Sequence, residues 1–124
     1  MLVRDSRLGG ALASKFADSP ETTSPDHSVV LMRRHGYTTH GKDIETAVYR
    51  AIYTKVNAGV QTNAMMLRSA LPSFAPTVQA KFDFEPLTDD MCKGCLKMNE
   101  GTQDKPWKLW AADVEKSPLY SNRG

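Results

Sequence analysis

Few residues in this chain have the type and spacing of a chemical site, and the best candidate is His35. It follows an apolar run and two arginines and directly precedes Gly36, in the segment VVLMRRHGYTTHG at residues 29–41. A neutral imidazole is a common ligand of zinc and related divalent metals. The other two histidines, His27 and His40, stand in no His-x-His or His-x3-His relation to His35. On spacing alone, a structural or surface histidine is the commoner interpretation, and metal ligation is the alternative.

Two other groups of residues could also do chemistry. Arg33 and Arg34 could bind an anion through paired hydrogen bonds, although adjacent arginines more often form a solvated strand end. Cys92 and Cys95 form a C-x2-C pair, which could supply half of a zinc site or a redox dithiol. No second C-x2-C pair occurs in the sequence. We therefore interpret the two cysteines as ordinary residues of a helix.

Composition excludes several classes of protein. The chain has 124 residues, of which 40% are apolar, so we expect one domain with at most a modest core. A formal net charge of +2 gives no field that would favour nucleic acid or an anionic membrane as a partner. The sequence contains two cysteines and shows neither a signal peptide nor a stretch of about 20 apolar residues. These features predict a cytoplasmic protein with no nucleic-acid or membrane partner.

A pair of short strands is predicted to position His35. The apolar run at residues 29–32 favours a strand buried on both faces, and Tyr37 begins a second extended segment that ends at Gly41 and could pair with the first. Before the strands, residues 6–16 show helical spacing with Asp5 or Ser6 as the N-cap, and residues 17–28 have the composition of a loop.

Three further helices are predicted after the strand pair. Asp43 can cap a long amphipathic helix over residues 43–71, which Pro72 and Pro76 would end. Residues 72–124 then carry two C-terminal helices and a tail, with Thr88 capping the first helix and Asp104 the second. Trp107 and Trp110 are spaced to lie on one face of that last helix, which favours a core position for both.

The segment HGYTTHGKDIETA, residues 35–47, resembles the His-Gly-x4-Gly motif and following helix of the class II aldolase/adducin family. The preceding apolar strand, VVLMR, and the earlier segment LGGALA at residues 8–13 fit the same family. Residues 98–120 resemble the C-terminus of its fungal-type branch. The resemblance therefore covers nearly the whole chain.

Several expectations follow from this resemblance. The family fold is an α/β/α layered domain, so the chain would be a partial, truncated domain with a short antiparallel strand pair and about four helices. The family holds a divalent metal, usually zinc, with three histidines, and the histidine of the His-Gly motif matches His35. Arg33 and Arg34 become candidate substrate contacts, and Gly36 and Gly41 structural residues of the motif. The catalytic residues of the family have no assigned match here.

The resemblance implies a metal-dependent carbon–carbon lyase of the aldolase, epimerase or dehydratase type, acting on small hydroxy-carbonyl compounds. The chain has no upstream His-x-His, so the family's metal site would be incomplete in these residues. Two alternatives stay open: a non-catalytic, adducin-like interaction module, and a degenerate fragment. The first predicts a homo-oligomer or association with a full-length homologue.

Overall fold

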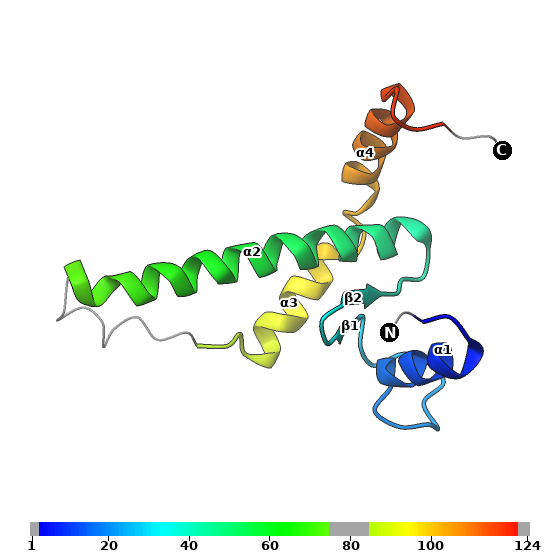
Figure 1. The fold of residues 1–124 in the computed structure, drawn as a ribbon, viewed down its shortest axis with the longest axis horizontal. Coiled ribbons are helices and arrows are strands. Elements are labelled where there is room, and N and C mark those ends of the chain that lie inside the picture. Colours follow the sequence, from blue (N-terminus) through cyan, green and yellow to red (C-terminus); the bar gives the residue numbers. More distant parts are fainter. Residues whose placement is uncertain (1–2, 75–84, 122–124) are drawn as a thin grey trace. The chain divides into compact units, whose positions relative to one another are not determined.

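The computed structural model describes residues 3–74 and 85–121 of the chain (Figure 1). The elements, in order, are α1 (Ser6–Ala13), the 3₁₀ turn η1 (Ser14–Phe16), β1 (Val29–Met32), β2 (Gly36–Thr39), α2 (Ile44–Phe74), α3 (Asp89–Asn99) and α4 (Asp104–Lys116). The described residues form four α-helices and one antiparallel strand pair, as the sequence predicted, which is consistent with a partial α/β domain. By their contacts, the residues fall into two compact units, Met1–Ile52 and Tyr53–Gly124.

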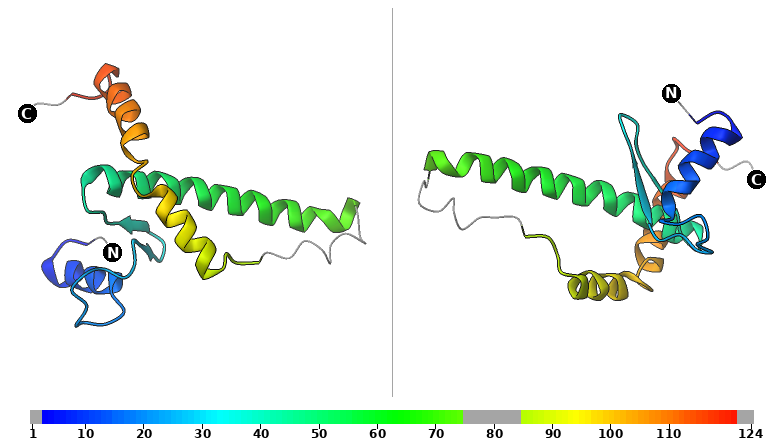
Figure 2. Two further views of the ribbon diagram at one scale, coloured as in Figure 1. Left: turned by 180° about the vertical axis from the view of Figure 1, so that it is seen from behind. Right: turned by 90° about the horizontal axis from the view of Figure 1, so that it is seen from below.

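The first unit opens with α1 and a loop that returns to the start of β1 (Figure 2). Asp5 is the N-cap of α1, because its Oδ1 accepts a hydrogen bond from the N–H of Leu8 at 2.7 Å. Polar contacts close the following loop. The N–H of Asp18 donates to Asp26 Oδ2 at 2.8 Å, and His27 Nε2 lies 2.7 Å from Asp18 Oδ1. The N–H of His27 donates to the carbonyl of Phe16, which ties both ends of the loop together.

The two strands form an antiparallel hairpin, with Val29 opposite Thr39 and Met32 opposite Gly36. Both strands were predicted, but the expected burial of residues 29–32 on both faces is wrong. Leu31 is 77% exposed, and the other residues of β1 are only partly covered. The reason is that β1 pairs with β2 alone in the described sheet, so its other edge and part of its surface have no neighbour.

The helix α2 begins after Asp43, as predicted, and continues through Gly59 without a break. The N–H of Thr46 donates to Asp43 Oδ1 at 2.7 Å, so Asp43 caps the helix. The helix ends at Phe74 rather than at residue 71. Pro72 lies in the last turn, where the missing proline N–H removes one backbone hydrogen bond without stopping the turn. Pro76 lies outside the described residues.

In the second unit, α3 begins as predicted and α4 differs in its cap. Thr88 caps α3, since its hydroxyl accepts from the N–H of Met91 at 3.3 Å. The N-cap of α4 is Gln103 and not Asp104, which is the first helical residue. The Gln103 side chain accepts from the N–H of Gly101 at 2.8 Å, and Gly101 has a φ of +93°. The glycine therefore lets the chain turn sharply between the two helices.

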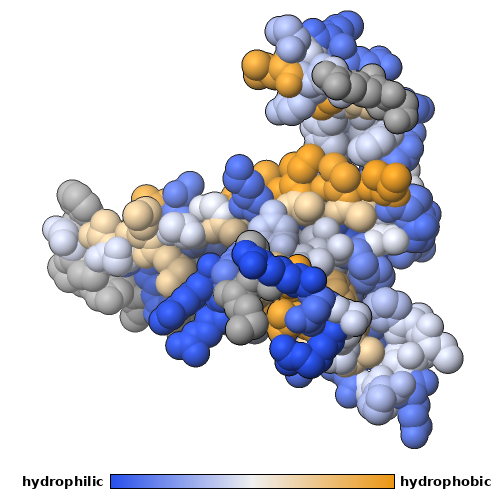
Figure 3. All heavy atoms as spheres, turned by 45° about the vertical axis from the view of Figure 1, so that its right-hand side comes forward, coloured by the Kyte–Doolittle hydropathy of each residue, from blue (hydrophilic) through white to orange (hydrophobic). Residues whose placement is uncertain are grey.

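Burial is low throughout the described residues. None of their apolar side chains is buried, and the two buried residues among them, Thr46 and Gln103, are polar and each 8% exposed. Trp107 and Trp110, expected in a core, are partly exposed. Apolar side chains accordingly lie open on the surface (Figure 3). None of the helices in the described ranges has the length and apolar character needed to span a bilayer.

Candidate functional site

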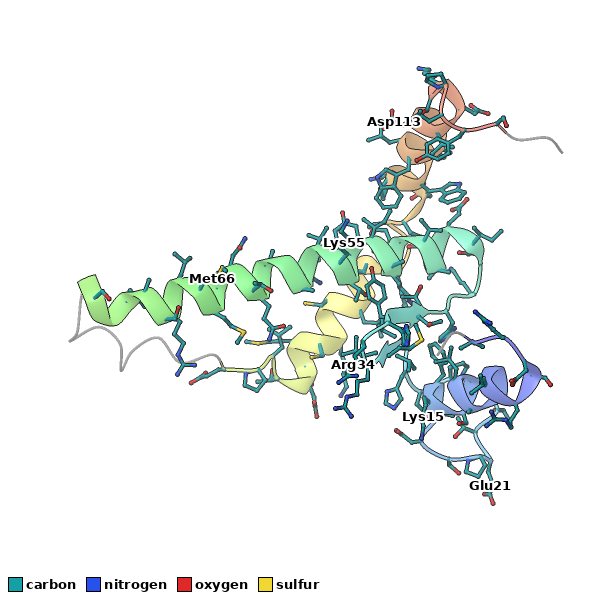
Figure 4. The ribbon with its side chains drawn as sticks, viewed as in Figure 1. Lys15, Glu21, Arg34, Lys55, Met66 and Asp113 are labelled. Atoms are coloured by element: carbon teal, nitrogen blue, oxygen red, sulfur yellow. The ribbon has the colours of Figure 1, made fainter. Side chains whose placement is uncertain are left out.

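The hairpin turn between β1 and β2 carries the residues that the sequence nominated for chemistry. Arg33, Arg34 and His35 form this turn and all are exposed. The turn is closed by a hydrogen bond from the N–H of His35 to the carbonyl of Met32, at 3.0 Å. Arg34 lies at the closed end of the hairpin (Figure 4). The turn therefore presents two guanidinium groups and one imidazole from three consecutive residues.

Arg34 adopts an unfavourable backbone conformation in this turn. Its φ is +66°, in the left-handed region that glycine occupies freely and that larger residues rarely adopt. Such a conformation costs about 1–3 kcal/mol in a non-glycine residue. Gly36, two residues later, has a φ of +93°. Glycine at position 36 thus relieves strain at one of the two left-handed positions, while Arg34 keeps it at the other.

The strand β2 is attached to the start of α2 by three hydrogen bonds from side chains to backbone carbonyls. The Tyr37 hydroxyl donates to the carbonyl of Ala51 at 2.6 Å, and the Thr39 hydroxyl donates to the carbonyl of Ala47 at 3.1 Å. Arg50 donates from its guanidinium to the carbonyl of His40 at 2.8 Å. These contacts hold the hairpin, and with it the turn at His35, against a helix.

Gly41 makes this attachment sterically possible. A Cβ atom at this position would lie 2.6 Å from the backbone nitrogen of Ala47, 2.9 Å from Cβ of Thr46 and 3.0 Å from the carbonyl oxygen of Asp43. These distances are too short for any side chain. The second glycine of the His-Gly-x4-Gly motif is therefore needed for close approach of the chain to the first turn of α2.

Asp43 adds an electrostatic contribution at the same helix terminus. Hydrogen bonds from the side chain and the backbone N–H of Thr46 lower the pKa of the Asp43 carboxyl below its usual value. A carboxylate at the N-terminus of a helix also interacts favourably with the helix dipole. The ionised form of Asp43 is therefore the form that the folded chain favours.

The three histidines lie in different local environments. His27 pairs with Asp18 in the loop, and the ring of His40 meets the ring of Phe16 edge-on, with 5.4 Å between centroids. His35 lies in the hairpin turn. No group of three or more histidine, cysteine or acidic side chains comes together within the part of the chain that the structure describes. These described residues therefore do not fit a complete three-ligand metal centre around His35.

Cys92 and Cys95 are helical residues, as the sequence analysis concluded. Both lie on α3, and both are exposed free thiols.

Sequence reasoning missed the anchoring roles of Tyr37, Thr39 and Arg50. The alternation of Tyr37 and Thr39 along β2 was the available signal, since alternate residues of a strand point to one face.

Comparison with known proteins connects this hairpin to a family. The profile described as "Class II Aldolase and Adducin N-terminal domain" matches residues 2–62, which include α1, the hairpin, Gly41 and the first half of α2. Residues 2–62 belong to the class II aldolase/adducin family. The family resemblance read from the His-Gly segment is thus confirmed.

A curated member of this class II aldolase/adducin group extends the similarity along the chain. The chain is 37% identical over 122 residues to decarboxylase tropJ of Talaromyces stipitatus. The alignment covers 98% of this chain and 45% of that relative, so the chain spans less than half of the relative's length. No solved structure matches the chain.

Proposed function

We propose that this chain is part of a metal-dependent carbon–carbon lyase of the class II aldolase type, which acts on small hydroxy-carbonyl compounds. Decarboxylation is the reaction within this class that we favour. The observation that supports it most is the 37% identity to decarboxylase tropJ over nearly the whole chain. Decarboxylation breaks the bond between the carboxylate carbon and the adjacent carbon atom. The carboxylate leaves as CO₂, and the adjacent carbon receives a proton. The substrate in this proposal is therefore a carboxylic acid.

In this proposal, His35 is one ligand of a divalent metal, with zinc as the first choice. The described residues bring no group of three or more histidine, cysteine or acidic side chains together. The other ligands, and the group that handles the proton, would come from polypeptide outside the described residues. Arg33 and Arg34 would contact the substrate, and Gly36 and Gly41 would shape the turn and its attachment to α2.

The family fold is part of the same proposal. We propose that the chain contributes to a single α/β/α domain in which the sheet has more strands than β1 and β2. A hairpin on its own is marginally stable in water, and both outer edges of this one are unpaired in the described sheet. The exposed apolar side chains support the same proposal, because further layers would cover them. A cytoplasmic location is proposed with it.

A chimaera tests the proposed activity. The segment of decarboxylase tropJ that aligns with this chain is replaced by the chain itself, and CO₂ release from the relative's own substrate is measured together with bound zinc. We expect an active chimaera in which His35→Ala lowers activity and zinc affinity by at least roughly 10- to 100-fold, the loss that even outer-shell partners of a metal ligand show. His27→Gln, in a histidine of the loop, is the matched control and should keep both. A folded, inactive chimaera, or an active His35→Ala variant with full zinc, would contradict the proposal.

A second candidate function is a non-catalytic interaction module. It is favoured by the absence of a three-donor group and by the exposed apolar residues in the described ranges. This candidate predicts a homo-oligomer, or a complex with a full-length homologue. Size-exclusion chromatography with light scattering, on the chain alone and mixed with decarboxylase tropJ, tests it. A monomer in both experiments would count against the module, and a degenerate fragment would show neither cooperative melting nor association.

A further inference from the structure

We propose that Arg33 and Arg34 in the hairpin turn bind the carboxylate group of the substrate. This inference rests on the proposed function, in which the substrate is a carboxylic acid, and it names the residues that recognise the acid group. It also assigns the turn a role that is independent of metal binding at His35.

The first argument is that the positive charges of Arg33 and Arg34 are not neutralised by any carboxylate of the described residues. No carboxylate of the described residues forms an ion pair with Arg33 or Arg34. Some of the other cationic side chains do have partners: Lys93 lies 3.7 Å from Asp90, and Arg50 donates to the carbonyl of His40. Each guanidinium carries five N–H donors in a fixed plane. Two adjacent guanidinium groups with no ion-pair partner among the described residues therefore give the turn a local excess of positive charge and of hydrogen-bond donors.

The second argument is backbone geometry. Arg34 holds a φ of +66° at a position where glycine would fit without strain. Strained residues in native structures concentrate at binding and catalytic sites, so an observed outlier supports a functional hypothesis. The strand register and the hydrogen bond from His35 to Met32 fix this turn on both sides. The Arg34 side chain is thus presented from a defined turn rather than from a mobile tail.

The third argument concerns the kind of anion. A carboxylate accepts two parallel hydrogen bonds from one guanidinium, in a geometry that suits recognition of a single acid group. The net charge of +2 for the whole chain does not provide the extended basic surface that polyanions require. Phosphate shares the anionic chemistry of a carboxylate, so the experiment must separate the two.

The test uses the complete 124-residue chain without added metal. Arginine side-chain N–H signals are followed by NMR during titration with hydroxypyruvate, which carries a carboxylate. Dihydroxyacetone, a hydroxy-carbonyl compound without the acid group, and inorganic phosphate are titrated in parallel. Two variants are compared: Arg34→Gly, which removes the guanidinium and suits the positive φ, and Arg7→Gln, which removes an exposed arginine from α1 as a control.

We expect millimolar binding of hydroxypyruvate, at least tenfold weaker binding of dihydroxyacetone and phosphate, and at least a tenfold loss in Arg34→Gly. Arg7→Gln should bind as the unchanged chain does. Equal binding by Arg34→Gly, or tighter binding of phosphate, would overturn the proposal. Arg34-dependent binding in the chain, combined with an inactive chimaera, refutes the proposed lyase and keeps the anion site. An active chimaera with no such binding refutes the anion site alone.

Discussion

Replacing Gly41 by alanine should break the attachment of the hairpin to α2. The added Cβ would lie 2.6 Å from the backbone nitrogen of Ala47, whereas ordinary contact begins at 3.4 Å. The two atoms must therefore separate by about 0.8 Å, the difference between these distances. The nitrogen of Ala47 and the carbonyl oxygen of Asp43, which also lies close, are backbone atoms joined to each other by a hydrogen bond, so no flexible side chain can move aside instead.

The magnitude follows from what this shift disturbs. If the first turn of α2 moves by about 0.8 Å, the Asp43 cap lengthens from 2.7 Å toward 3.5 Å. Losing an N-cap costs about 1 kcal/mol, and overpacking costs about 1–3 kcal/mol. Reduced freedom of alanine in the unfolded chain offsets about 0.4–1 kcal/mol. We therefore expect Gly41→Ala to lower local stability by about 1–3.5 kcal/mol.

Amide hydrogen exchange measures this local stability directly. The N–H groups of Thr46 and His40 report on the helix start and on the end of β2, because they donate to Asp43 and Ser28. Exchange at both should accelerate roughly 5- to 300-fold, since 1.4 kcal/mol corresponds to a factor of ten. Gly59→Ala is the matched control, because a Cβ there meets nothing within 4 Å in the interior of α2. That variant should stabilise its helix by about 0.5–1 kcal/mol.

The reasoning would be refuted by unchanged exchange at Thr46 and His40 in Gly41→Ala. Such a result would mean that the chain does not pass as close to the first turn of α2 as the structure shows. Destabilisation of equal size by Gly59→Ala would also refute it, because the effect would then reflect alanine itself rather than its position.

Two further predictions concern the same attachment of the hairpin to α2. Asp43→Asn should keep the helix cap but remove its pH dependence, because asparagine caps equally well and does not titrate. The folded-state pKa of Asp43 is lowered, so its stabilisation is present above about pH 4 and is lost as the pH falls through the lower folded value. The protection of the Thr46 amide, which is its intrinsic exchange rate at each pH divided by the observed rate, should therefore fall between pH 5 and pH 2 more in the unchanged chain than in Asp43→Asn, and parallel profiles would contradict this. Tyr37→Phe should lose the 2.6 Å hydrogen bond to Ala51 and about 0.5–1.5 kcal/mol of local stability. Faster exchange of β2 amides checks it, with Tyr120→Phe in the exposed tail as the control that should change nothing.

Local features of this structure could be predicted from sequence, because their causes lie within a few residues. The caps at Asp5, Asp43 and Thr88 each place a side-chain oxygen three residues before the N–H that it accepts from. The strand pair around the His-Gly turn likewise followed from residue types with extended preference and from a glycine. The cap of α4 could not be predicted this way. Gln103 makes no side-chain capping bond, and its side-chain oxygen instead accepts from the N–H of Gly101 in the turn before the helix.

Burial could not be predicted from the local pattern. Leu31, Trp107 and Trp110 have the character of core residues, yet each has exposed surface in the described chain. Whether an apolar face is covered depends on distant segments, which a local pattern does not contain. In the candidate site, too, a feature set by nearby residues could be predicted and features set by contacts between elements could not. His35 was expected next to a strand end and lies in the turn between β1 and β2, whereas the anchors Tyr37 and Arg50 depend on how the hairpin meets α2.

The bonds that attach β2 to α2 also bear on the order of folding. They join residues only 8 to 14 positions apart in the sequence, and the hairpin register joins residues no farther apart than Val29 and Thr39. Closing loops of this length is entropically inexpensive and fast, on the order of 10–100 ns for a loop of about ten residues. Contacts of such low order favour early formation. During synthesis, the hairpin and the first turns of α2 could therefore assemble as soon as residue 51 leaves the ribosome, before α3 and α4 exist.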